Sequence, residues 1–304
     1  MPDSSIFTSA PEALYALATA AARSVVVVGT AKNAGKTTAF NALRAVAARR
    51  GVAIAVTSIG RDGEPSDALD AEPKPRVRLA PGTIVALPAG LVPRSPAIAI
   101  LEGGAMSALG TTVFARVVLP TTCEIAGPPT ARAMRATIDR LRALCAGPVF
   151  VDGAIDRVAP LAGGEDAVVI ATGAASGATI ARVCAVAADV VARLTLPGRD
   201  PARERARTIR IVGALDVRDA ERLLGEAAGA TVIVDDPTRV TIRGALFAKL
   251  CATVDLRCEH PLHVVACTTS PVGRDATLSP RALADAVAHA TGLPTFDVVA
   301  DLAA

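Results

Sequence analysis

Residues 25–38, VVVVGTAKNAGKTT, constrain the fold more than any other stretch of the chain. The four consecutive valines predict a strand that is buried on both faces, as strands of parallel sheets are. This strand runs into a glycine-bounded loop, and the loop ends in Gly35-Lys36-Thr37 at the start of an amphipathic helix. The order of strand, glycine loop and helix N-terminus predicts a phosphate-binding loop in an α/β protein.

Each part of this loop has a chemical role in the prediction. Backbone N–H groups and the helix dipole would present partial positive charge to phosphate oxygens. Lys36 is expected to reach the β- and γ-phosphates of ATP, and the Thr37 hydroxyl to ligate Mg²⁺. The expected cofactor-binding residues are Gly29, Thr30, Ala31, Lys32, Asn33, Ala34, Gly35, Lys36, Thr37 and Thr38.

The loop departs from the common G-x-x-x-x-G-K-[ST] pattern at one position. The first glycine is expected at position 30, which is Thr30, whereas the glycine lies one place earlier at Gly29. A chance glycine-rich turn is the alternative. Gly29-Thr30 followed by Gly35-Lys36-Thr37 resembles the loop of dethiobiotin synthetase, a P-loop family related to the Min and Par ATPases. That resemblance makes Lys32 a candidate for a second lysine acting across a dimer interface; a solvated lysine is the alternative.

Acidic residues follow several of the expected strands. Asp62 and Glu64 lie in the loop after the strand at 52–57, where P-loop proteins place an acid that positions water or magnesium; a polar turn explains them equally well. Asp152 follows the apolar run at 149–151, and Glu102 follows that at 97–101. Either acid could support Mg²⁺ at the carboxyl edge of a sheet, and Asp152 is the preferred candidate.

Composition narrows the functional class. Hydrophobic residues make up 51 % of the chain and aromatic residues only 2 %, so the core must consist of aliphatic side chains and alanine. Lys and Arg number 32 against 29 Asp and Glu, which does not indicate a nucleic-acid partner. The six cysteines form no C-x-x-C pair, and no targeting or membrane-spanning segment is evident. These features predict a reduced, cytoplasmic protein.

Alternating strand and helix patterns predict a doubly wound, mostly parallel sheet carrying the P-loop. The segment 197–207, PGRDPARERAR, is charged, contains proline and lacks apolar periodicity. We therefore expect a nucleotide-binding domain over 1–200 and a smaller α/β region over 201–304.

Several segments together resemble a more specific family. GTAKNAGKTT, TSIGRDGE, VDGAIDR and the ATGAA strand end are similar to the reactivase of lysine 5,6-aminomutase, and the similarity extends into DDPTR and FDVV. The resemblance implies an ATPase that releases damaged cobalamin from a B12-dependent aminomutase in lysine degradation. It also implies a possible second reactivase subunit. On this basis Lys36, Asp62 and Glu64 are the expected catalytic residues, and Thr37, Asp152 and Glu102 the candidate metal ligands.

Other functions stay open at this point. A ligase or kinase like dethiobiotin synthetase would phosphorylate a small carboxylate without a protein partner, and Glu102-Gly103-Gly104 favours it. A nucleotide-binding scaffold and a metallochaperone GTPase are further alternatives. No N-K-x-D motif for guanine is present, so ATP is the expected nucleotide. A homodimer is possible.

Overall fold

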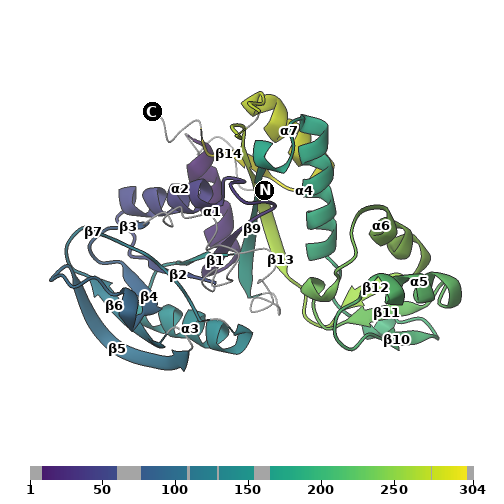
Figure 1. Cartoon of the computed structure of the whole chain (residues 1–304), viewed down its shortest axis with the longest axis horizontal. Coiled ribbons are helices and arrows are strands. Elements are labelled where there is room, and N and C mark those ends of the chain that lie inside the picture. The colour runs from purple at the N-terminus through teal and green to yellow at the C-terminus, as the bar shows by residue number, and fades with distance from the viewer. Residues whose placement is uncertain are drawn as a thin grey trace.

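The computed structural model describes residues 9–59, 77–107, 110–128, 130–153, 165–274 and 276–299. Within these residues the chain has an α/β fold, with one large, mostly parallel sheet and seven α-helices (Figure 1). The predicted α/β class is confirmed. No helix of the described ranges is both long and apolar enough to cross a membrane.

Nine strands form the large sheet. Neighbouring strands are parallel from β14 through β4, and β6 and β5 add an antiparallel hairpin at one edge. In spatial order the strands are β14 (Thr295–Asp297), β13 (His263–Ser270), β9 (Asp166–Gly173), β1 (Ser24–Gly29), β8 (Val149–Asp152), β2 (Ala55–Ser58), β4 (Ile84–Pro88), β6 (Gly110–Val117) and β5 (Ile98–Ser107).

Helices cover both faces of this sheet. One face packs against α1 (Ala10–Ala21) and α2 (Lys36–Arg49). The other packs against α3 (Ala131–Leu144), α4 (Ile180–Leu194) and α7 (Pro280–Thr291). Because side chains alternate along a strand, Val25 and Val27 of β1 enter the first core, and Val26 and Val28 enter the second. The prediction of a strand buried on both faces is thereby confirmed.

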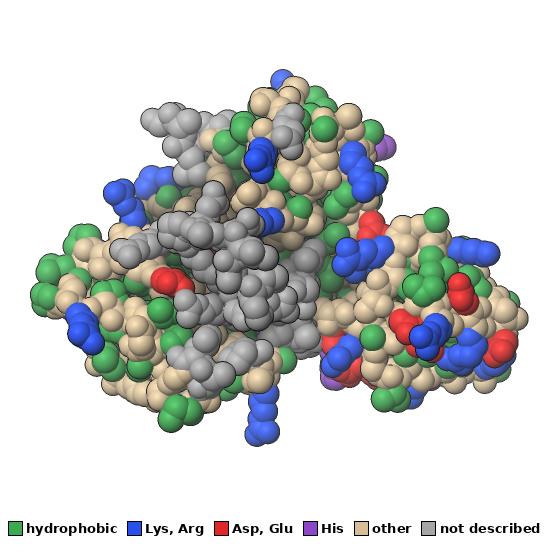
Figure 2. Space-filling model, viewed as in Figure 1, with side chains coloured by type: hydrophobic (Ala, Val, Ile, Leu, Met, Phe, Trp, Pro, Cys, Tyr) green, Lys and Arg blue, Asp and Glu red, His purple; other side chains and the backbone are tan. Residues whose placement is uncertain are grey.

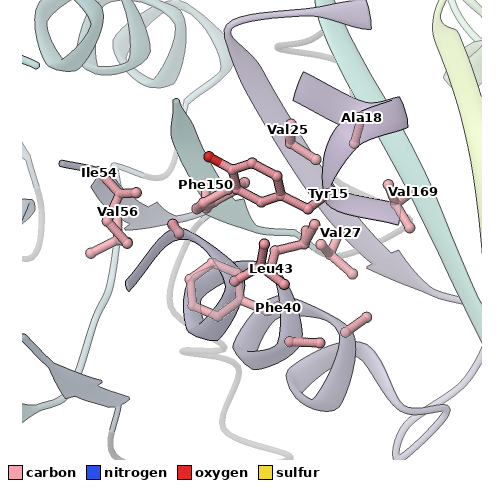
Figure 3. Close-up of a cluster of buried hydrophobic side chains, with 14 of the residues drawn as sticks. Tyr15, Ala18, Val25, Val27, Phe40, Leu43, Ile54, Val56, Phe150 and Val169 are labelled. Carbon is pink, nitrogen blue, oxygen red and sulfur yellow. The ribbon is translucent and has the colours of Figure 1, made fainter. Parts of the chain in front are cut away.

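The core under α1 and α2 contains most of the aromatic side chains that the sheet buries (Figure 3). Tyr15 of α1 tilts against Phe150 of β8, with ring centroids 6.2 Å apart. Phe40 and Leu43 of α2 close the same cluster. Helix α1 was not predicted from the sequence. It begins after Ser9, and a proline in its first turn is pre-organised for the helix.

A smaller unit lies between α4 and β13 in the sequence. Its three parallel strands are β10 (Thr208–Arg210), β11 (Thr231–Val234) and β12 (Asp255–Cys258), and its helices are α5 (Val217–Glu226) and α6 (Gly244–Thr253). These elements share a separate apolar core. In Figure 2 acidic and basic side chains are interspersed over the face of this unit that is in view.

The expected region 201–304 is therefore divided. Strands β13 and β14 join the large sheet next to β9, and α7 packs against α4, so the end of the chain belongs to the first core and not to the small unit. Apolar runs such as that of β13 show a buried strand, but they do not show which sheet it joins.

The strand expected at 97–101 is longer in the structure. β5 continues through Glu102 to Ser107 and pairs with β6, so Glu102 lies within an edge strand and not at a strand end. Two irregularities in the β5–β6 register accommodate its two glycines. A short antiparallel pair, β3 (Val77–Leu79) with β7 (Thr121–Cys123), was likewise not expected.

Candidate functional site

The glycine loop lies at the middle of the large sheet. Strand β1 pairs with β8 on one side and β9 on the other, and it delivers the loop at the carboxyl edge of the parallel strands. Helix α2 begins at Lys36, directly after the loop. This is the edge at which open α/β sheets bind ligands. The central position follows from the valine run, because a strand with two buried faces needs neighbours and helices on both sides.

Two residues with a left-handed backbone conformation shape the loop. Asn33 has φ of 62°, and Gly35, the N-cap of α2, has φ of 92°. A Cβ on Gly35 would lie 2.7 Å from the Cβ of Ser270, which is closer than side chains approach. Glycine is therefore required at position 35 by the backbone angle and by the neighbouring β13.

Thr30 anchors the start of the loop. Its amide donates to the carbonyl of Ala171 at 2.9 Å, which extends the pairing of β1 with β9. Its hydroxyl donates to Thr172 Oγ1 at 3.0 Å and lies 2.7 Å from Ser176 Oγ. The residue at the position where the common pattern has glycine thus ties the loop to the end of β9.

The N-terminus of α2 is open. Gly35 supplies no side-chain cap, and the first turn contains no acidic residue. The first N–H groups of an α-helix lack partners within the helix, so this end is electropositive. Thr37 and Thr38 in the first turn are half-buried, whereas Lys32 and Asn33 at the loop crest are exposed.

A lysine and a carboxylate meet beside this helix end. Lys36 Nζ lies 3.1 Å from Asp152 Oδ1, and about a third of each side chain is exposed (32 % and 27 %). Asp152 ends β8 in register with Val27 of β1 and Ser58 of β2. The amides of Ile59 and Gly153 continue the pairing, donating to the carbonyls of Asp152 and Val27 at 2.8 Å each. The backbone therefore fixes where this carboxylate lies.

Glycines bring further segments close to the strand ends. A Cβ on Gly153 would lie 2.8 Å from Val26 Cγ1, and one on Gly127 would lie 1.8 Å from the carbonyl oxygen of Ser58. A Cβ on Gly173 would lie 2.1 Å from the carbonyl oxygen of Ser270. Close packing of Ser270 against both Gly35 and Gly173 was missed from the sequence. Its only signal was the hydroxyl-rich strand end at 268–270.

The structure does not bring Glu102 to this site. Four strands separate β5 from β1, which is about 24 Å at the usual strand spacing. Glu102 instead pairs with Arg140 of α3, and this arginine holds the pKa of the Glu102 carboxyl below its ordinary value. Of the two candidate metal-supporting acids, Asp152 is therefore the one that lies beside the loop. Of the other predicted acids, Asp62 and Glu64 lie outside the described residues.

The donor set at the loop is made of oxygen atoms. Asp152 supplies a carboxylate and Thr37 a hydroxyl, which are ligand types that Mg²⁺ accepts when phosphates and water complete its shell. In the described ranges no three His, Cys, Asp or Glu side chains gather as a metal site would need. The residues therefore fit a metal brought with a phosphate ligand better than a dedicated metal centre.

Comparisons of the chain with protein-family models, with curated proteins and with solved structures find no match.

Proposed function

We propose that the chain binds Mg·ATP at the loop between β1 and α2 and hydrolyses it, as a P-loop ATPase with a doubly wound sheet. The observation that carries the proposal is the contact between Lys36 and Asp152, at 3.1 Å, beside an uncapped helix N-terminus. A strand, a glycine loop and a helix in this order form a recurrent phosphate cradle.

The residues of the loop have distinct roles in binding. Gly29 and Gly35 leave the backbone open to phosphate oxygens, and the first N–H groups of α2 donate to them. Lys36 turns from Asp152 to the β- and γ-phosphates. A partly exposed ion pair contributes only about 0–1 kcal/mol, so this exchange costs little compared with the gain of charge-assisted contacts to phosphate.

Thr37 and Asp152 would hold the metal, directly or through its water shell. Mg²⁺ supplies neutralisation of the charge that develops on the β- and γ-phosphate oxygens. The register of Asp152 with β1 and β2 supports this role, and in the proposal the carboxylate is freed from Lys36 when the lysine moves to phosphate. In the nucleotide-free chain, the contact between Lys36 and Asp152 thus holds both side chains beside the loop until the nucleotide and the metal bind.

Asp62 and Glu64 complete the proposed machinery. Their segment follows Ile59, whose amide donates to the Asp152 carbonyl. We propose that one of these carboxylates orients the attacking water and responds to loss of the γ-phosphate, as switch segments of P-loop proteins do.

We further propose that hydrolysis serves a protein partner, as the resemblance to the aminomutase reactivase implies. The partner would be a cobalamin-dependent aminomutase, from which the ATPase cycle releases damaged cobalamin, with a second reactivase subunit taking part. The ligase alternative is weakened by Glu102. The strand-end glutamate on which that alternative drew pairs with Arg140 at the far edge of the sheet.

The experiment is ATP hydrolysis by the purified chain, with and without a cobalamin-dependent aminomutase inactivated in turnover. Stimulated hydrolysis, together with recovery of mutase activity when adenosylcobalamin is added, is the expected result. Hydrolysis that needs a small carboxylate and ignores the mutase would favour the ligase class. GTP in place of ATP tests the nucleotide, and we expect slower turnover with GTP.

A further inference from the structure

A cavity lies on the α2 face of the sheet, away from the glycine loop. It has a volume of about 920 Å³, and its walls come from α2, the segment 51–54 that leads into β2, the β3–β4 turn and β7. Figure 1 shows α2, β3 and β7 near one another. Ile54 and Thr83 of its lining directly precede β2 and β4, so the cavity lies at the amino edge of these parallel strands, opposite to the carboxyl edge that carries the glycine loop. The cavity is therefore separate from the loop.

The cavity wall is mostly apolar, and its polar side chains are two arginines with Asn41, Thr83 and Thr122. Ile54 and Leu79 are buried in it, and Ala45 and Ala48 of α2 face it. The charged residues among its described lining are Arg44 and Arg78, and no Asp or Glu is among them. A volume of this order, an apolar wall and few polar groups are typical of small-molecule sites.

Arg44 has one donor without an acceptor. One Nη donates to Asn41 Oδ1 at 2.9 Å, and the other donates to the carbonyl of Arg78. Its guanidinium also lies 5.5 Å from the centre of the Phe40 ring. Nε is buried and, within the described ranges, has no hydrogen-bond partner. A buried cationic donor that lacks an acceptor is unfavourable, and an anion supplied from outside would satisfy it.

No carboxylate in the described part of the chain forms an ion pair with Arg44, and burial raises the pKa of the nearby Cys123 thiol to about 11, so that thiol is neutral. Burial lowers the pKa of the Arg44 guanidinium to about 10, which leaves it protonated at neutral pH. Arg78 is exposed at the rim and adds a second positive charge.

We propose that this cavity binds a small organic carboxylate with an apolar body. The carboxylate accepts from the Arg78 guanidinium and, once the Arg44 side chain turns to open its Nε to the cavity, from Arg44 Nε. The body lies along Ala45, Ala48 and Leu79. Charge complementarity selects an anion, and the apolar wall selects against inorganic phosphate or a sugar. This inference does not rest on the proposed ATPase activity.

Calorimetric titration with octanoate, and with 1-octanol as the uncharged match, tests the proposal. We expect octanoate to bind about tenfold more tightly than octanol or better. Arg44→Met keeps the aliphatic stem and should remove this preference, whereas Ala48→Trp, from the exposed side of α2, should weaken binding of both probes. Arg281→Met, on α7 with its side chain 95 % exposed, is the control and should bind as the wild type does.

Three results would overturn the proposal. Octanoate that binds no more tightly than octanol, or not at all, would show that the arginines recognise no carboxylate. Binding that survives both Arg44→Met and Ala48→Trp would place it elsewhere. Loss of octanoate binding in Lys36→Ala would place it at the glycine loop. If Arg44→Met fails to fold, as judged by circular dichroism, Ala48→Trp alone decides.

Discussion

Lys36 Nζ and Asp152 Oδ1 lie 3.1 Å apart, although 115 positions separate these residues in the chain. The contact exists because β1 and β8 are neighbours and end at the same edge of the sheet. It places Lys36, the first residue of α2, beside the acid that ends the neighbouring strand β8. This geometry is why the loop is proposed as a site for a phosphate chain with its metal.

Removing the lysine should abolish turnover and leave the fold intact. Lys36→Ala takes away the charge that would contact the β- and γ-phosphates, so we expect ATP hydrolysis to fall by about a hundredfold or more. The melting temperature should change little, because the side chain is partly exposed. Lys249→Ala, at an exposed position on α6, is the matched control. Near-native hydrolysis by Lys36→Ala would refute the loop assignment.

Substitutions at Asp152 and at Glu102 should have different effects on the Mg²⁺ dependence of hydrolysis. Asp152→Asn is expected to raise the Mg²⁺ concentration needed for half-maximal hydrolysis, because a carboxylate binds the cation better than an amide does. Glu102→Gln should leave that concentration unchanged, since Glu102 pairs with Arg140 at the sheet edge. The reverse outcome would mean that the roles of the two acids are exchanged.

Gly35 and Gly51 offer a matched pair for backbone strain. Both have positive φ, 92° and 64°, but a Cβ meets Ser270 only at position 35. Gly51→Ala should lower the free energy of unfolding by about 1 kcal/mol. Gly35→Ala should lower it by about 3 kcal/mol, because overpacking adds to the strain. Denaturant unfolding measures both, and adding Ser270→Gly should restore part of the Gly35→Ala loss. Equal losses at the two positions would contradict the close contact.

The Thr30 hydroxyl should stabilise the loop. Thr30→Val removes its hydrogen bonds to Thr172 and Ser176, so we expect a loss of about 1–2 kcal/mol in the free energy of unfolding. Thr19→Val is the control, because the Thr19 hydroxyl bonds only to the carbonyl of Tyr15 in its own helix. A loss no larger than that of Thr19→Val would show that Thr30 does not tie the loop to β9.

Stability should fall at alkaline pH because of buried thiols. Burial raises the pKa of Cys123 and Cys267 to about 11 and that of Cys258 to about 12, from an ordinary value of 9.0. Above pH 9 the unfolded chain loses these protons and the folded chain keeps them. The free energy of unfolding therefore declines from pH 9 toward 11 and is unaffected below pH 8. Cys258→Ala should flatten that decline; an unchanged slope would contradict this origin.

The parts of the fold that the sequence predicted are those with strong local patterns. The valine run of β1, the helix after Lys36 and the strand that leads to Asp152 each have a period or a buried run that packing then enforces. The glycine loop also indicated where α2 begins.

The parts that were not predicted depend on distant partners. Nothing local in β13 distinguishes the large sheet from the small one, and β5 was judged to end at Glu102 because glycines interrupt its pattern. The contact of Ser270 with Gly35 joins residues far apart in the chain, and its only sequence signal was the hydroxyl-rich strand end at 268–270. For Lys36 and Asp152, the sequence predicted that both lie at the carboxyl edge of the sheet, but not that their side chains are in contact.

The most direct test of the central claim is calorimetric titration of the wild-type chain and of Lys36→Ala with ATPγS, with and without Mg²⁺. The account predicts binding at one site per chain, tighter with Mg²⁺ and lost or greatly weakened in Lys36→Ala. Binding that is the same in Lys36→Ala and independent of Mg²⁺, or no binding by the folded wild-type chain, would contradict it.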